Sequence, residues 1–295
     1  MSPSNGNIYH GGNVPEMLKR EGGLRLKGIA KSSRPGNPLV SIITVVYNGG
    51  QHLEGTIRSV IGQSYEPVEY IVVDGGSTDG TLDLLAKYDD RIDYWISEPD
   101  KGISDAMNKG ILLSNGELIA HLHADDFFPD PSVLSSVCSE YLRHPGALWM
   151  TGGIHLVDPE GKILQEIKVR KYSYGKLVRG NILLHPATFV TRKAFETIGM
   201  FDVEYRYAMD YDLWLRLGAI ADPVPLELQV ACFRVHAGSR SIVRSDMAYD
   251  ESWRIRKKHL QGHPVKISCH YLYYTFCKRF VRAYYKNLLS GGNPS

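Results

Sequence analysis

Acidic residues stand in three short turns of the first half of the chain, each just after an apolar run. They are Asp74, Asp100 and Asp125. If the runs are parallel strands, their carboxyl ends share the edge of a sheet at which ligands bind. Carboxylates at such an edge suit a hard divalent cation and a nucleotide. A single Asp is more typical of a turn or helix cap, but three at successive strand ends indicate a site.

Asp74 and Tyr47 end neighbouring apolar runs and suggest how a base could bind. A lone carboxylate at the end of a buried strand is costly unless it accepts hydrogen bonds. The imide N–H of uracil would donate one to Asp74, and Tyr47 could stack on the same base. The alternative for Tyr47 is a packed core side chain.

The segment from His123 to Asp126 carries two adjacent carboxylates after the fourth apolar run. Adjacent carboxylates repel each other. A bound divalent cation relieves that repulsion while it neutralises a diphosphate. The sequence therefore predicts a cation site at this strand end.

Asp210 and Asp212 open a predicted helix over 210–217. Residues two apart on a helix face nearly opposite ways, so at most one of them can enter a cleft. Asp210 shares a face with Trp214 and Leu217, which must turn toward the protein body. We therefore predict that Asp210 is the inward acid, with a helix N-cap as the alternative.

The elements that must carry these residues follow from hydrophobic periodicity. The first half of the chain alternates β-branched runs with amphipathic stretches. This alternation predicts an α/β fold with a doubly wound, mostly parallel central sheet. The predicted strands are 39–47, 68–73, 92–97 and 118–122, and the predicted helices are 52–63, 78–88 and 103–114.

After residue 131 the pattern becomes mixed and predicts an appended region that completes one domain. Its predicted helices are 132–142, 193–198, 210–217 and 245–259, and its predicted strands are 147–157, 163–168, 184–191 and 226–235. We divide the chain into a flexible basic arm (1–38), a domain with two halves (39–130 and 131–245) and a C-terminal helical extension (246–295).

The composition of the 295 residues, 43% hydrophobic and 22% charged with a net charge of +2, is that of a globular protein. It excludes a disordered chain, a collagen-like repeat and a disulfide-stapled mini-protein. The four cysteines show no pairing pattern and are expected to be reduced thiols of a cytoplasmic chain. No apolar stretch is long enough to span a membrane, and the N-terminus lacks the apolar core of a signal peptide.

The small net charge conceals an uneven distribution along the chain. Residues 1–38 hold six basic and two acidic residues, and residues 251–295 hold nine basic residues and one acidic residue. The part between them has a balance of −10. An acidic body without a known nucleic-acid motif argues against nucleic acid as a partner.

The C-terminal stretch 268–289 alternates aromatic and basic residues. On a helix, one arc would hold Tyr273, Phe276, Phe280, Tyr284 and Leu288, and another would hold Lys278, Arg279, Arg282 and Lys286. This pattern is typical of an amphipathic helix in a membrane interface, with its cations near anionic lipid. The alternative is a helix that packs its aromatic side chains onto the domain.

Taken together, these segments resemble the inverting glycosyltransferases of family 2, above all bacterial enzymes that build O-antigen, capsule or exopolysaccharide. The motifs are Val45-Val-Tyr-Asn48, Val72-Val-Asp-Gly-Gly-Ser-Thr-Asp-Gly-Thr81, Glu98-Pro-Asp-Lys-Gly-Ile103, Asp105-Ala-Met-Asn-Lys-Gly110, His123-Ala-Asp-Asp126, Met209-Asp-Tyr-Asp-Leu-Trp214 and Arg234-Val-His236. Their order and spacing from about residue 39 to about residue 241 make the resemblance specific.

The resemblance implies a GT-A fold whose first half binds the nucleotide and whose second half binds the acceptor. It implies that Asp74 binds uracil, that Tyr47 stacks on it, and that Lys101, Asn108 and His123 belong to the nucleotide site. His123 stands where the family often has the first Asp of an Asp-x-Asp element.

The resemblance also implies that Asp125 and His236 hold Mg²⁺ or Mn²⁺, with a structural histidine as the alternative for His236. Asp210 would be the base that takes a proton from the acceptor hydroxyl, although Met209 replaces the Glu of the family's Glu-Asp pair. A single displacement with one base gives inversion at the sugar carbon. No Gln-x-x-Arg-Trp element is present, which argues against a processive polymerase.

The function that follows is metal-dependent transfer of a sugar from a nucleotide-sugar, expected to be a UDP-sugar, to a hydroxyl of a lipid-linked saccharide. Such an acceptor and the basic tail place the enzyme at the inner face of the plasma membrane. The alternatives are a polyisoprenyl-phosphate sugar synthase and a nucleotide-sugar-binding protein without activity.

Overall fold

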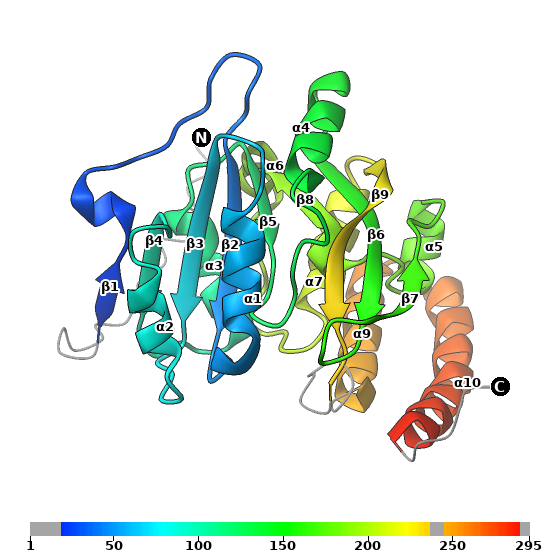
Figure 1. The fold of residues 1–295 in the computed structure, drawn as a ribbon. Coiled ribbons are helices and arrows are strands. Elements are labelled where there is room, and N and C mark those ends of the chain that lie inside the picture. Colours follow the sequence, from blue (N-terminus) through cyan, green and yellow to red (C-terminus); the bar gives the residue numbers. More distant parts are fainter. Residues whose placement is uncertain (1–18, 237–244, 290–295) are drawn as a thin grey trace, which may run out of the picture.

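The computed structural model describes residues 19–236 and 245–289, in which nine strands form one mixed sheet (Figure 1). Its parallel centre consists of β2 (Val40–Val46), β3 (Val68–Asp74), β4 (Tyr94–Ser97) and β5 (Leu118–His121). The other strands are β1 (Arg20–Gly22), β6 (Trp149–Val157), β7 (Ile163–Ile167), β8 (Thr188–Thr191) and β9 (Val224–Arg234). The strand order is β1-β4-β3-β2-β5-β8-β6-β7, and β9 runs parallel to β6.

Helices cover both faces of the sheet because the central strands are buried on both sides, as every position of β2 and β3 is. One face packs against α1 (Gly50–Ile61), α2 (Thr81–Lys87) and α4 (Val133–Arg143). The other packs against α3 (Ile103–Leu113), α5 (Tyr174–Arg179), α6 (Arg192–Ile198) and α7 (Met209–Gly218). Adjacent β2 residues divide between the two faces, since Ile42 belongs to the first core and Ile43 to the second.

These elements confirm the predicted α/β class with its mostly parallel centre. All predicted strands and helices are present, with ends that differ by a few residues. The sequence did not indicate β1, α5 or the short 3-10 helices η2 (Leu24–Lys27) and η3 (His185–Ala187).

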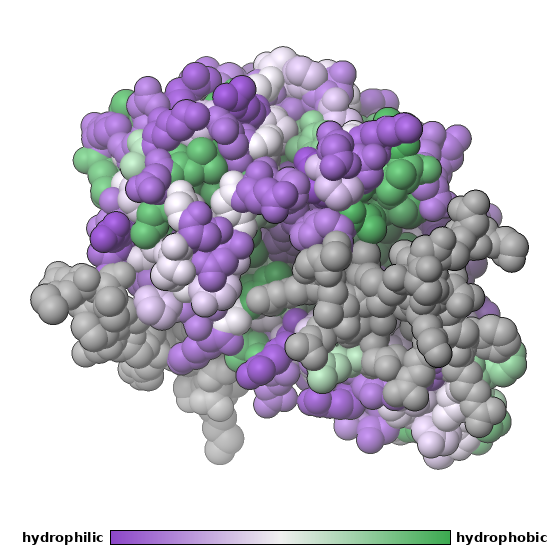
Figure 2. All heavy atoms as spheres, turned by 60° about the horizontal axis from the view of Figure 1, so that its bottom comes forward, coloured by the Kyte–Doolittle hydropathy of each residue, from purple (hydrophilic) through white to green (hydrophobic). Residues whose placement is uncertain are grey.

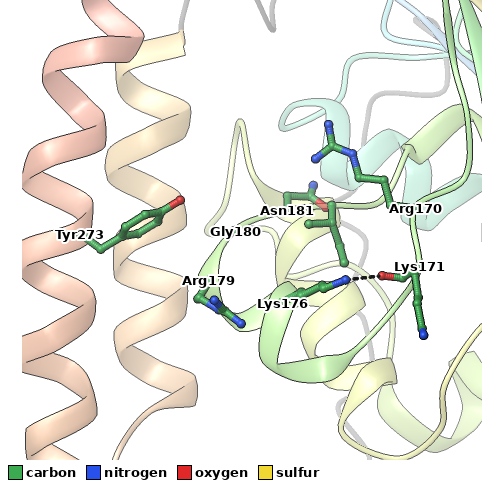
Figure 3. A pocket seen from close by; sticks show the side chains of 8 residues that line it. Arg170, Lys171, Lys176, Arg179, Gly180, Asn181 and Tyr273 are labelled. Atoms are coloured by element: carbon green, nitrogen blue, oxygen red, sulfur yellow. Dashed lines mark hydrogen bonds between the residues drawn. The ribbon is translucent and has the colours of Figure 1, made fainter.

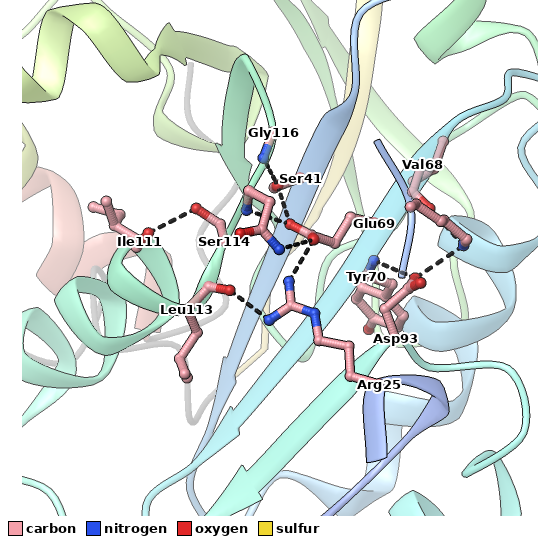
Figure 4. Close-up of polar contacts among 12 residues, drawn as sticks. Arg25, Ser41, Val68, Glu69, Tyr70, Asp93, Ile111, Leu113, Ser114 and Gly116 are labelled. Atoms are coloured by element: carbon pink, nitrogen blue, oxygen red, sulfur yellow. Dashed lines mark hydrogen bonds and ion pairs between the residues drawn. The ribbon is translucent and has the colours of Figure 1, made fainter. Parts of the chain in front are cut away.

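Residues 19–38 pack on the body, which corrects the prediction of a flexible arm for this part of 1–38. Strand β1 pairs antiparallel with β4 at the edge of the sheet. Arg25 forms an ion pair with the buried Glu69 and donates to the carbonyl of Leu113 at 2.6 Å (Figure 4). Lys31 pairs with the buried Asp93 at 2.9 Å. Arg25 and Lys31 are therefore partners of buried carboxylates of the domain. The rest of the predicted arm, 1–18, lies outside the described residues.

The predicted boundary at residue 246 also needs correction, because α9 (Ser245–His259) is part of the domain. Its Ile255 is fully buried and belongs to the same core as α7. Its Glu251 is 7% exposed and accepts hydrogen bonds from the backbone N–H groups of residues 206–208, at 2.7 to 3.1 Å. These donors immediately precede α7, so α9 holds the segment that leads into the helix that carries Asp210.

The last helix, α10 (Pro264–Leu289), packs on α9, in line with the packed alternative for its aromatic side chains. Tyr274 stacks on Trp253 with ring centroids 5.3 Å apart. Other side chains of α10 face solvent, among them Leu272 (69% exposed) and Phe276 (63%). The predicted arcs beyond Lys278 lie outside the described side chains. Among the described residues, no helix combines the length and the apolarity needed to cross a bilayer.

Candidate functional site

The carboxyl ends of β2, β3, β4 and β5 lie together at the lower edge of the sheet in Figure 1. Figure 2 turns this edge toward the reader and shows mainly hydrophilic side chains on that face. Tyr47 follows β2 and is 59% exposed, so the core alternative for its side chain does not hold. An exposed ring at this edge is available to stack on a planar ligand.

Asp74, at the end of β3, is fully buried, and both of its carboxylate oxygens are engaged. One accepts from the hydroxyl of Ser77. The other accepts from the N–H of Gly76 at 3.2 Å, the N–H of Ser77 at 3.0 Å and the hydroxyl of Ser97 at 2.6 Å. Both oxygens of this buried carboxylate are thus satisfied by partners within the protein. Asp74 therefore fixes the turn that follows β3.

Asp100 lies next to that turn, and its Oδ2 has no hydrogen-bond partner in the described part of the chain. Its Oδ1 accepts from the N–H of Gly102 at 2.7 Å. Its Oδ2 lies over the Cα of Gly75, only 2.5 Å from where a Cβ of residue 75 would stand, and the ring of Tyr47 lies 3.3 Å from the same point. Because Gly75 has no Cβ, the space over its Cα stays open to the carboxylate of Asp100 and the ring of Tyr47.

Lys101 and Asn108, both predicted nucleotide contacts, are placed differently by the structure. Lys101 is exposed, and its backbone N–H donates to Asp105 at 3.1 Å. Asn108 is 2% exposed, and its amide group exchanges two hydrogen bonds, at 2.9 and 3.0 Å, with the backbone of Phe201. The prediction for Asn108 is wrong, because its polar atoms hold the Phe201 segment against α3 in the interior.

Asp125 and His236, predicted to share a cation, are in direct contact. The Asp125 Oδ2 lies 3.1 Å from the His236 Nε2, and both side chains are partly exposed. His52 of α1, which the sequence did not indicate, lies next to them, with its ring centroid 5.6 Å from that of His236. Burial lowers the pKa of His52, and the charges of Arg234 and His236 lower it further, while Asp125 raises it.

Asp126 faces away from this pair. It is fully buried and accepts from the backbone N–H of Arg234 at 3.1 Å. Burial first, and then the charge of Asp125, raises its pKa well above the usual value. Of the two adjacent acids, Asp125 alone therefore faces His236. No group of three or more His, Cys, Asp or Glu side chains in the described part of the chain is placed to hold a metal by itself.

Asp210 and Asp212 point to different environments, as their helical spacing predicts. Asp212 is 1% exposed and pairs with Arg216 at 2.8 Å. Asp210 is half-buried and accepts from the amide of Asn181 at 3.0 Å and from the N–H of Tyr211 at 2.7 Å. Burial raises the pKa of Asp210, and these two hydrogen bonds oppose that rise.

His123 and His185 form a stacked pair near Asp210, with ring centroids 5.1 Å apart and planes 10° apart. A charge on His123 lowers the pKa of Asp210, so the two groups are within electrostatic reach. Neither ring nitrogen of His185 has a hydrogen-bond partner among the described residues. Burial lowers the pKa of His185 to about 4, which keeps its ring neutral. The sequence carried no signal for His185 beyond its place in a predicted strand.

A doubly wound sheet with acids at its carboxyl edge, and a further acid on a separate helix, is the arrangement of a GT-A glycosyltransferase. The sequence model of the family described as glycosyl transferase family 2 matches residues 41–188, and the chain belongs to this family. The predicted family, fold and enzyme class are thereby confirmed.

Curated relatives and solved structures agree. An uncharacterized glycosyltransferase of Mycobacterium tuberculosis (strain H37Rv) is 35% identical over 196 residues, which cover 64% of this chain and 72% of the relative. Another, of Haemophilus influenzae, is 28% identical over 249 residues, which cover 78% and 76%.

Two solved structures share the fold. Residues 1–349 of TarS from S. aureus, in complex with UDP-GlcNAc, align with a TM-score of 0.58 and 16% identity, over 78% of this chain and 69% of that one. The mannosyltransferase PcManGT from Pyrobaculum calidifontis, in complex with GDP-Man and Mn²⁺, aligns with a TM-score of 0.59 and 18% identity, over 90% and 79%.

Proposed function

We propose that this glycosyltransferase moves a sugar from a UDP-sugar to a hydroxyl of a lipid-linked saccharide, with inversion at the sugar carbon and with a divalent cation. The observation that carries the proposal is Asp210, a half-buried carboxylate with a raised pKa that is held by Asn181 within the predicted acceptor half of the domain. Solved structures of the same fold hold UDP-GlcNAc or GDP-Man, which supports a nucleotide-sugar donor.

The base of the donor would bind between Tyr47 and Asp100. Tyr47 supplies an exposed ring for stacking, and the Oδ2 of Asp100 faces the same space over Gly75. Asp74 would support them from behind by holding the turn with four hydrogen bonds. The exposed Lys101 would contact the diphosphate.

Asp125 and His236 would hold the cation, because one carboxylate oxygen and one imidazole nitrogen are already side by side. Such a mixed donor set suits Mn²⁺ better than Mg²⁺, which favours oxygen ligands. The diphosphate would supply further oxygens. A bound cation offsets the negative charge that develops on the departing diphosphate.

In the reaction, Asp210 takes the proton of the acceptor hydroxyl while that oxygen forms a bond to C1 of the sugar. The bond from C1 to the diphosphate oxygen breaks on the opposite face, and its electron pair leaves with the nucleoside diphosphate.

The acid limb of the pH–rate profile should report on Asp210. The base works only when deprotonated, so kcat falls as the pH drops through its pKa, which lies above that of an ordinary Asp. The Asn181 amide stabilises the charged form. Asn181→Ala should therefore raise this pKa and move the acid limb to higher pH, with donor affinity as the control. A limb that stays in place, or moves to lower pH, would contradict the assignment.

Gly75→Ala should weaken UDP binding by about tenfold, since the new Cβ displaces the carboxylate of Asp100 from the space beside Tyr47. Isothermal titration with UDP and Mn²⁺ measures the effect. Gly55→Ala is the matched control, because nothing lies within 4 Å of its Cβ position. Equal affinities in the two variants would show that the base does not bind over Gly75.

Mn²⁺ should increase the stabilisation by UDP in a thermal-shift assay, and Asp125→Asn should remove most of this Mn²⁺-dependent part. Asp90→Asn changes the same charge at an exposed position outside the site and serves as the control. If Asp125→Asn keeps the full Mn²⁺ effect, the cation is held elsewhere. Mn²⁺-dependent hydrolysis of the UDP-sugar without acceptor tests the activity itself, and an inactive nucleotide-sugar-binding protein would show none.

A further inference from the structure

A basic pocket of about 540 Å³ lies between α5 and α10 (Figure 3). Its lining includes Arg170, Lys171, Lys176, Arg179, Asn181 and Tyr273. Tyr273 reaches from α10 toward α5 and closes one side.

Four cationic side chains line this pocket, and no carboxylate pairs with any of them in the described part of the chain. Two of them are held by backbone carbonyls. Lys176 donates to the carbonyl of Lys171, and Arg179 to that of Gly175, both at 3.2 Å. The positive potential extends to α10, where burial and then the charges of Arg256, Arg179 and Lys266 lower the pKa of His270. Like charges gathered without counter-charges favour an anionic ligand.

The pocket is tied to the proposed base by two contacts. Asn181 lines the pocket and donates to Asp210 at 3.0 Å. The helix that carries Lys176 and Arg179 is fixed to α7, because the hydroxyl of Tyr211 donates to the carbonyl of Leu177 at 2.9 Å. An anion bound here would therefore lie at a fixed position relative to Asp210.

We infer that this pocket binds the phosphate or diphosphate that links the acceptor saccharide to its lipid. The inference rests on the proposed function and adds where its acceptor is held. Guanidinium and ammonium groups form charge-assisted hydrogen bonds with phosphate oxygens. With the phosphate in the pocket, the attached sugar extends past Asn181 and presents its hydroxyl to Asp210.

The test compares the double variant Lys176→Gln/Arg179→Gln with the control Lys193→Gln/Arg91→Gln, which removes the same charges at exposed positions outside the pocket. Transfer is measured to a short-chain alkyl diphosphate-linked saccharide and to the same saccharide as an alkyl glycoside without phosphate. For the pocket variant we expect KM to rise about 10- to 100-fold for the diphosphate acceptor and to stay unchanged for the glycoside. Donor hydrolysis without acceptor should be the same in both proteins.

Each other outcome overturns the inference in a distinguishable way. Equal KM values with intact donor hydrolysis would refute the pocket and leave the proposed function standing. If the pocket variant no longer binds phosphatidylglycerol vesicles but keeps its KM for the diphosphate acceptor, the pocket binds membrane lipid headgroups and not the acceptor. If the sugar is transferred to a polyprenyl phosphate that carries no saccharide, the phosphate is the nucleophile and does not merely anchor an acceptor sugar in the pocket. If neither protein hydrolyses the donor, the proposed function fails. Titration with pyrophosphate in EDTA then still tests the pocket. Equal pyrophosphate affinities of the pocket variant and the control variant would refute it.

Discussion

Replacing Asp210 by Asn should lower the rate of sugar transfer by about 10²- to 10⁴-fold, the usual contribution of a general base. An amide has nearly the shape of the carboxylate, so the contacts to Asn181 and Tyr211 can largely remain. The amide cannot take the proton of the acceptor hydroxyl. Donor affinity should stay within about twofold of the parent, because Asp210 acts on the acceptor.

Turnover and donor affinity, measured separately, check this prediction. Asp222→Asn provides the matched control, since Asp222 is an exposed acid just beyond the other end of α7. Normal turnover in the Asp210 variant would mean that another group is the base. A loss of donor binding equal to the loss of turnover would move Asp210 from the acceptor to the donor site.

Replacing Glu251 by Ala should have the largest effect on stability. The buried carboxylate accepts from three successive backbone N–H groups, those of Arg206, Tyr207 and Ala208. Each donor left without a partner costs about 1–3 kcal/mol, so we expect a loss of about 3–5 kcal/mol in the free energy of unfolding. Thermal or denaturant unfolding measures it.

Glu251→Gln keeps one acceptor oxygen, so its free energy of unfolding should fall less. The control Glu196→Ala, at an exposed position, should leave the free energy of unfolding almost unchanged. Because residues 206–208 lead into α7, the folded Glu251→Ala protein should also show a lower kcat with little change in the donor KM. An Ala variant as stable as the parent would show that the contacts of Glu251 do not stabilise the segment that leads into α7.

Local patterns were sufficient for most of the regular elements. The β-branched runs predicted β2 and β3 almost to the residue, because strands buried on both faces need apolar side chains at every position. Helix α5 was missed because its six residues are too few to show a helical repeat of apolar side chains. The packing of residues 19–38 was missed because it depends on Glu69 and Asp93, which are distant in sequence.

The position of a candidate residue in the fold was predictable where one helix or one strand end decided it. Helical spacing separated Asp210 from Asp212, and the strand-end rule brought Tyr47, Asp74 and Asp125 to one edge of the sheet. Spacing could not show that Asp74 would be enclosed by its own turn, or that Asn108 would bond to Phe201. The contact of Asn181 with Asp210 joins residues that local patterns do not connect.

The pairing of β1 with β4 also affects how the protein behaves among its own copies. An open edge of a parallel sheet presents unpaired N–H and C=O groups on which a strand of another molecule can add, and natural proteins commonly cover such edges. Three residues of the N-terminal segment cover this one by pairing with residues 95–97. The stretch 41–188 that defines the family contains β4 but not its cover. An excised domain with those bounds would expose an aggregation-prone edge, so colloidal solubility, as well as stability, depends on residues outside the family's own signature.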